Sequence, residues 1–265
     1  MNILVCVKQV PDTTEIKINP ETNTLIREGV PSIVNTFDGF ALEMGVRIKD
    51  KQETKIVVIS MGPAQAANAL KECLSVGADK AYLISDRAFG GSDTLATSYI
   101  LSRAVKAVEE KEGPFDLILC GKQAIDGDTA QVGPELAEHL NYPQITCATD
   151  IFVEEGKVKV NRETENGKEI WETALPAVIT VTKPAFDPRY PSIKSKIAAN
   201  RAVIPVLTVN EVTAEPERCG LKGSPTKVKK IFVPPRKTGG TMISEETAQE
   251  SAAKLATLLS DAGLV

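Results

Sequence analysis

Short apolar runs alternate with amphipathic segments along the first half of the chain. Four runs have the length and apolar character of buried strands, and they are Ile3 to Val7, Ile56 to Ser60, Ala81 to Ile84 and Leu117 to Cys120. Three stretches between them carry apolar residues at helical spacing, and these span residues 37–48, 66–74 and 95–108. Repeated alternation of strand and helix predicts an α/β fold, in which a parallel sheet is covered by helices on both faces.

After Leu140 the pattern changes, because strand signals follow one another without a helical stretch between them. They lie at Ile151 to Glu154, Lys157 to Glu163 and Ile170 to Thr173, with Asn166-Gly167 as a predicted hairpin turn. Nearer the N-terminus, Glu15 to Arg27 carries Asn19-Pro20 at a turn. This segment predicts an inserted hairpin.

Beyond Val209 the pattern predicts an extended arm. Residues 210–241 contain four prolines and few apolar clusters. A helix is predicted after the arm, with Ser244 as its N-cap and Gly263 as its end. Its apolar stripe includes Leu255, Leu258 and Leu259. Such a helix must bury this stripe, either on its own domain or on another subunit.

Composition limits the function classes and the compartment. The 265 residues carry a net charge of −4, which gives no support to a nucleic-acid partner or an anionic membrane surface. The N-terminal apolar run is too short for a signal segment or a membrane span, so we expect no membrane insertion. Five scattered cysteines without a C-x-x-C pair are typical of reduced thiols, which favours a cytoplasmic location, and we assign none of them to a metal.

A polar loop follows the fourth predicted strand and leads into a helical segment at Pro134. It has the sequence CGKQAIDGDTAQVGP from Cys120 to Pro134. Glycines here let the backbone approach a ligand, and free N–H groups at a helix start favour phosphate. The loop therefore predicts an anion or nucleotide site, although ordinary turn glycines would give a similar pattern.

The order of residues in this loop resembles the nucleotide loop of the beta subunit of electron transfer flavoproteins. Further segments of the chain resemble that family in the same order, and they are Asn2 to Lys8 with Gln9-Val10-Pro11-Asp12 after it, Ser60 to Gln65, Gly77 to Lys80, Leu175 to Thr182, and Asp187 to Ser192. The resemblance implies a Rossmann-like, adenine nucleotide alpha hydrolase-like domain over residues 1–209. It also implies that residues 210–265 form an arm and helix that dock on an alpha subunit through Leu255, Leu258 and Leu259.

The resemblance places an adenine nucleotide at the carboxyl ends of the parallel strands, where the crevice rule for open α/β sheets also expects ligands. The implied contact residues are Cys6, Asn35, Thr36, Phe37, Asp38, Met61, Gly121, Lys122, Gln123, Ala124, Ile125, Asp126, Gly127, Asp128, Thr129, Ala130, Gln131 and Val132. For Cys6 and Met61 taken alone, simple core packing is the better explanation, and only their position at strand ends favours a place in the site.

Two features favour FAD over AMP as the nucleotide. Gly127 stands where the AMP-type loop has an acidic residue, which leaves space for a diphosphate. The segment Gly90 to Thr97 resembles the electron-bifurcating branch and adds Asp93, Thr94 and Thr97 to the predicted contacts. A glycine turn with Asp93 as helix N-cap is the structural alternative, and AMP remains the alternative nucleotide.

No nucleophile with a neighbouring base is visible in the sequence, so redox chemistry would belong to flavins. The resemblance implies an electron-bifurcating heterodimer with NADH as electron donor. Oxidoreductase activity would belong to the complex and not to this chain alone. An acyl-CoA dehydrogenase or related acyl-CoA reductase and ferredoxin or flavodoxin would accept the electrons. A non-bifurcating carrier with AMP is the first alternative, and a stand-alone nucleotide-binding regulator is a more distant one.

Residues 184–201 resemble the family's recognition loop, which docks on acyl-CoA dehydrogenases. Ile193 matches the apolar anchor position. The continuation Ile193-Lys194-Ser195-Lys196-Ile197 departs from the family pattern. An ordinary loop with Ile193 buried in its own domain is the alternative.

Overall fold

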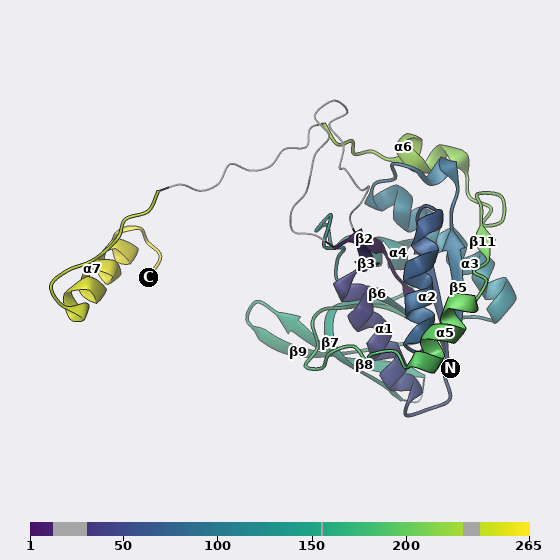
Figure 1. Cartoon of the computed structure of the whole chain (residues 1–265), viewed down its shortest axis with the longest axis horizontal. Helices are drawn as coiled ribbons and strands as arrows, with labels where there is room; N and C mark the ends of the chain where they lie inside the picture. Colours follow the sequence, from purple (N-terminus) through teal and green to yellow (C-terminus); the bar gives the residue numbers. More distant parts are fainter. Residues whose placement is uncertain (13–30, 155, 230–238) are drawn as a thin grey trace. The chain divides into compact units, whose positions relative to one another are not determined.

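The computed structural model describes residues 1–12, 31–154, 156–229 and 239–265. They belong to two compact units, 1–229 and 230–265. The described part of the first unit contains a nine-stranded sheet with the order β11-β5-β4-β1-β6-β10-β7-β8-β9 (Figure 1). In chain order these strands are β1 (Asn2–Cys6), β4 (Lys55–Met61), β5 (Lys80–Ile84), β6 (Leu117–Gly121), β7 (Gln144–Glu154), β8 (Lys157–Thr164), β9 (Gly167–Ala174), β10 (Ala177–Val181) and β11 (Val206–Leu207).

Helices cover both faces of this sheet because its buried strands are apolar on both sides. Ile3 and Val5 of β1 belong to one apolar cluster, which includes residues of α1 (Thr36–Lys49) and α2 (Ala67–Ser75). Leu4 and Cys6 belong to the opposite cluster, with residues of α3 (Thr94–Glu112) and α4 (Val132–Leu140). The predicted α/β fold is thus confirmed, and all four strands predicted in the first half are present.

The central strand β1 lies between β4 and β6, and both pair with it in parallel. From β1 the chain proceeds to β4 and β5 on one side, and it then returns to β6 on the other side. This reversal creates a switch point between β1 and β6, where open α/β sheets bind ligands beyond the carboxyl ends of their strands. Those ends are Cys6 and Gly121.

Strands β7, β8 and β9 form an antiparallel extension of the sheet. The predicted strand signals there are confirmed, but the predicted turn was one residue too late. Strand β8 ends at Thr164 and Gly167 already begins β9, so the turn consists of Glu165 and Asn166. A small antiparallel ladder joins β2 (Gln9–Pro11) to β3 (Ser32–Val34). The predicted inserted hairpin, Glu15 to Arg27, lies outside the described residues.

Residues 210–229, predicted as the start of the arm, remain within the first compact unit. Val212 and Cys219 are buried in the cluster beside α3, and short helices η3 (Pro216–Arg218) and α6 (Gly220–Gly223) follow the surface. Their burial places the end of this unit about 20 residues later than the predicted boundary at residue 209, although the arm itself stays a prediction. The remaining short helices are η1 (Ala64–Ala66) and η2 (Arg87–Phe89).

The second unit contains helix α7 (Ala248–Asp261). The predicted N-cap Ser244 was wrong, because Thr247 accepts a hydrogen bond from the Glu250 N–H and the Glu250 carboxylate accepts one from the Thr247 N–H. Gly263 follows the helix in the left-handed region, with φ of 67°, as predicted for a helix end. No side chain of α7 is buried. Among the described residues, no helix is long and apolar enough to cross a lipid bilayer.

Candidate functional site

Asn35 holds the 121–131 loop against the start of α1. This residue is fully buried at the N-cap position. Its side-chain amide donates to the Gln123 carbonyl at 2.8 Å, and its side-chain oxygen accepts from the Ile125 N–H at 3.0 Å. A buried amide with both ends satisfied fixes the loop backbone in one position.

Asp38, in the first turn of α1, ties the ends of β1 and β6 together. Its carboxylate accepts the Lys8 N–H at 2.7 Å and the Gly121 N–H at 3.1 Å. Burial raises the pKa of Asp38 to about 7, although hydrogen bonds from Lys8, Asn35 and Gly121 favour the charged form. The protein therefore holds a carboxyl group that titrates near neutrality at the switch point.

The two glycines of the loop have different surroundings. A Cβ on Gly121 would lie 2.7 Å from the Asp38 nitrogen and 2.7 Å from the Phe37 carbonyl carbon, so only glycine fits against the start of α1. A Cβ on Gly127 would meet no heavy atom within 4 Å. Gly121 therefore sets the close approach of two backbones, and Gly127 lies beside open space.

The two acidic residues of the loop are paired within the protein. Lys8 forms an ion pair with Asp126 at 2.7 Å, and the Gln123 amide donates to Asp128 at 2.7 Å. Asp128 also takes a left-handed backbone conformation, with φ of 51°. Because the Asp126 charge is compensated and the Asp128 oxygen is engaged, the loop repels an anion less than its sequence indicates.

The far end of the loop leads into α4 without a side-chain cap. Gln131 occupies the N-cap position but caps nothing, and Ala130 before it is left-handed, with φ of 54°. Thr129, Ala130 and Gln131 are all exposed, and Val132 begins the helix. Uncapped first-turn N–H groups beside exposed polar side chains are suited to an anionic oxygen.

Other residues of the loop form backbone hydrogen bonds. The Lys122 N–H donates to the Val181 carbonyl of β10 at 2.8 Å, and the Ala124 carbonyl accepts from Gly127 and Asp128. Among the described residues, the Lys122 ammonium forms no ion pair.

Cys6 and Met61 lie at the ends of β1 and β4, as expected, and both contact the α3 and α4 side of the core. A hydrogen bond with Cys120, together with burial, raises the pKa of the Cys6 thiol well above its ordinary value, so it stays protonated. Sequence reasoning missed Ser60, whose buried hydroxyl has no hydrogen-bond partner in the described part of the chain. An orphaned polar atom at a strand end is compatible with a ligand nearby.

At the start of α1, Thr36 is exposed and Phe37 packs edge-on against Phe40, with ring centroids 6.4 Å apart. Phe37 also contacts the α1 and α2 cluster rather than the α3 and α4 cluster that holds Cys6. The structure thus gives Phe37 a packing contact on the opposite side of the sheet.

The start of α3 is engaged within the protein. Asp93 caps the helix through the Ala96 N–H at 3.0 Å, and its second oxygen accepts from the Thr226 hydroxyl at 2.8 Å. The Thr94 hydroxyl donates to Glu135 of α4 at 3.1 Å, and the Thr97 N–H donates to the Asp93 carbonyl. Sequence reasoning missed Glu135, whose second carboxylate oxygen is buried without a described partner. A ligand role for Asp93 or Thr94 would compete with these contacts.

The segment 184–201 is held to α1 by an arginine. The Arg189 guanidinium donates to the buried Glu43 carboxylate at 2.9 and 3.0 Å and to Asp50 at 2.6 Å. From Ile193 to Arg201 the chain forms helix α5 rather than a loop, with Ser192 as N-cap. Ile193 is 83% exposed, so the alternative that it is buried in its own domain is wrong.

Comparison with known proteins now identifies the family. The electron transfer flavoprotein domain model matches residues 22–212. This chain belongs to the electron transfer flavoprotein family. The chain is 52% identical over 255 residues to the electron transfer flavoprotein subunit beta of Megasphaera elsdenii, which covers 95% of this chain and 94% of the relative. It is therefore a beta subunit of this family.

Two further relatives have more specific names. The chain is 48% identical to the caffeyl-CoA reductase-Etf complex subunit CarD of Acetobacterium woodii over the full length of both. It is 45% identical over 240 residues to protein FixA of Azotobacter vinelandii, which covers 88% of this chain and 84% of the relative. The family name implies association with a flavin or nucleotide.

Proposed function

We propose that this chain is the nucleotide-binding beta subunit of an electron-bifurcating electron transfer flavoprotein, with FAD beyond the carboxyl ends of β1 and β6. The observation that carries the proposal is the open space at Gly127, in a loop that leads to the uncapped start of α4 and whose acidic residues are already engaged. AMP is the alternative nucleotide. When bound, FAD supplies hydride acceptance from NADH and one-electron transfer.

The residues of this chain would have three roles toward the nucleotide. Asn35 and Asp38 hold the loop and the strand ends in place through buried hydrogen bonds. The first-turn N–H groups of α4 and the Lys122 ammonium would meet the phosphates. Lys8 would keep Asp126 compensated, so that the diphosphate is not repelled.

Our proposal includes NADH as electron donor and an alpha subunit that carries a second flavin. It also includes an acyl-CoA dehydrogenase or related acyl-CoA reductase and ferredoxin or flavodoxin as electron acceptors. Support for an acyl-CoA partner comes from the CarD relative, whose name places it in a caffeyl-CoA reductase complex. The proposed contact to the dehydrogenase is Ile193, which is exposed on α5. The proposed contacts to the alpha subunit are Leu255 and Leu258, which are exposed on α7, and Leu259 beside them. Such a complex would act in the cytoplasm.

Counting the nucleotides in the purified heterodimer tests the proposal. We expect about two FAD per heterodimer, and Gly127→Asp should reduce this to about one, because a carboxylate beside a diphosphate is repelled in a partly desolvated site. Gly127→Ala is the matched control and should keep both flavins, since a Cβ there meets no atom within 4 Å. The rate of NADH-driven ferredoxin reduction should fall in the variant that loses FAD and stay unchanged in the control. If the unmutated complex still contains one FAD and one AMP after FAD is resupplied, the proposed bifurcating function is wrong. The chain would then be part of a non-bifurcating carrier with AMP.

A further inference from the structure

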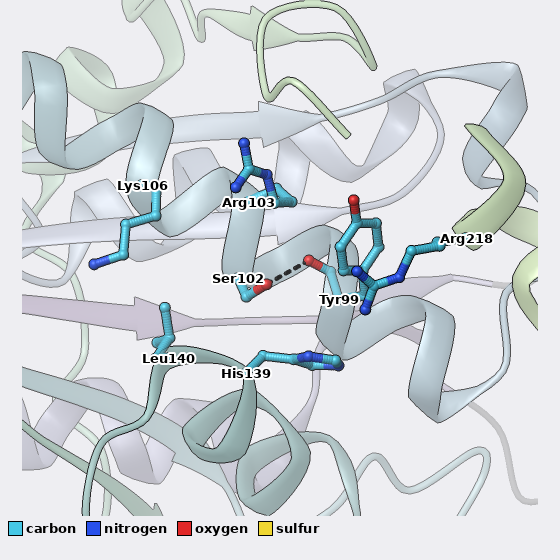
Figure 2. A pocket seen from close by; sticks show the side chains of 7 residues that line it. All are labelled: Tyr99, Ser102, Arg103, Lys106, His139, Leu140 and Arg218. Atoms are coloured by element: carbon cyan, nitrogen blue, oxygen red, sulfur yellow. Dashed lines mark hydrogen bonds between the residues drawn. The ribbon is translucent and has the colours of Figure 1, made fainter. Parts of the chain in front are cut away.

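A cavity of about 220 Å³ lies in the first unit, on the sheet face that α3 and α4 cover. Its walls are Tyr99, Ser102, Arg103 and Lys106 of α3, His139 and Leu140 of α4, and Arg218 of η3 (Figure 2). These residues come from the middle of α3 and the end of α4, whereas the proposed nucleotide site uses the starts of these helices. The cavity is therefore separate from the nucleotide site.

Positive charge is concentrated in this cavity. Within the described ranges, neither Arg103 nor Arg218 forms an ion pair with a carboxylate. Lys106 differs, because its ammonium is paired with Glu109 at 2.9 Å. The lining residues thus include two arginines and no carboxylate, and such a concentration of positive charge attracts an anion.

Arg103 is only partly satisfied. One of its terminal nitrogens donates to the Thr213 hydroxyl at 2.6 Å, while its Nε is buried and has no hydrogen-bond partner among the described residues. Arg103 therefore adds a guanidinium charge to the lining of the cavity, and Thr213 holds this side chain in place.

Arg218 is held in place by an aromatic ring. Its guanidinium carbon lies 3.8 Å from the centre of the Tyr99 ring, and Figure 2 shows the two side chains lying against each other. The Tyr99 hydroxyl in turn accepts the Glu215 N–H at 3.0 Å, which fixes the ring. Since stacking occupies the face of the guanidinium and leaves its edge N–H groups available, Arg218 is prepared for planar recognition of an oxyanion.

His139 completes the wall as an uncharged group. Burial and the nearby Arg218 charge lower the pKa of its imidazole, and its ring lies edge-on to Tyr99, with centroids 5.9 Å apart. A neutral imidazole adds a polar group to the wall without further repulsion between cations.

We propose that this cavity binds a phosphate group, either as free phosphate or as the phosphomonoester end of a small metabolite. Arginine pairs are suited to phosphate because each guanidinium donates two parallel N–H bonds. The cavity is smaller than the roughly 300–1,000 Å³ of typical ligand pockets. A tetrahedral oxyanion fits inside it, and because the cavity is open to solvent, any group attached to the oxyanion would extend outward.

Isothermal titration of the purified heterodimer with inorganic phosphate, at constant ionic strength, tests this inference. We expect saturable binding that Arg103→Gln and Arg218→Gln each weaken at least about tenfold, the loss of one charge-assisted contact. Lys222→Gln is the matched control, because this exposed lysine lies on α6 outside the cavity. Absence of saturable binding, or equal affinities in the arginine variants and in the Lys222 variant, would overturn the proposal.

A parallel titration with ribose 5-phosphate distinguishes the two sources of phosphate. Binding of both compounds, with the same dependence on Arg103 and Arg218, assigns the cavity to a phosphomonoester end, whereas binding of inorganic phosphate alone assigns it to free phosphate. If a glutamine variant does not fold, Arg103→Lys and Arg218→Lys keep the charge but lose the planar donor pair. They should still weaken binding measurably, and unchanged affinity in both lysine variants would also overturn the proposal.

Discussion

Substitution of Gly121 by alanine should be the most damaging small change in the loop. The added Cβ would lie 2.7 Å from two backbone atoms of residues 37 and 38, whereas ordinary van der Waals contact begins near 3.4 Å. The start of α1 and the end of β6 would have to separate by more than half an ångström. Such overpacking costs about 1–3 kcal/mol. Loss of the Gly121 N–H bond to Asp38 would add about 1–2 kcal/mol.

We therefore expect Gly121→Ala to lower the free energy of unfolding by roughly 2–5 kcal/mol, measured by urea denaturation with circular dichroism. Gly127→Ala is the control, and it should change stability by less than about 1 kcal/mol because its Cβ enters open space. Bound nucleotide should decrease only in the Gly121 variant. A loss below 1 kcal/mol for Gly121→Ala, or equal losses in both variants, would refute the close approach of β6 and α1.

Three further predictions concern other parts of the chain. The pKa of Asp38 is raised from its ordinary 3.8 to about 7, so the protonated carboxyl stabilises the folded state. This contribution to the free energy of unfolding is complete below pH 3.8 and is lost as the pH rises through 7. The nucleotide-free chain should lose about 1.4 kcal/mol between pH 6 and 8 in urea denaturation, and Asp38→Asn should not show this loss; equal slopes would contradict the assignment. Ile193→Ala should slow electron delivery to the dehydrogenase but leave NADH oxidation by a dye unchanged, and equal slowing would place Ile193 in the flavin site or the fold. Deletion of residues 239–265 should abolish the heterodimer in size-exclusion chromatography while the first unit stays folded, and an unchanged heterodimer would show that α7 is not needed for association.

Local patterns in the sequence were sufficient for the strands of the central sheet. Strands β1, β4, β5 and β6 begin or end within one residue of their predicted limits, because each is a short apolar run buried on both faces. The position of β10 between β6 and β7 could not be predicted this way, since strand order depends on contacts between distant segments. Helix α5 was missed because its exposed, lysine-containing sequence lacks a clear apolar stripe.

Some errors came from signals that were present but not used. The capping box at Thr247 and Glu250 matches the usual spacing, whereas Ser244 has no acidic or amide residue three positions later. Other features had no local signal at all. Asp93 accepts a hydrogen bond from Thr226, and Asp126 pairs with Lys8. The residues of each pair lie more than a hundred positions apart, so only the fold reveals that these carboxylates are occupied.

Helix α1 joins two features that lie far apart in the sequence, because Asp38 holds the strand ends and Glu43 holds Arg189 of the segment before α5. Glu43 follows Asp38 by five positions, which is about 7.5 Å of helix. One inserted or deleted residue between them would turn Glu43 by about 100° away from Arg189. The number of residues between Asp38 and Glu43 is therefore fixed by these two contacts, and changing it would shift the segment before α5 relative to the switch point.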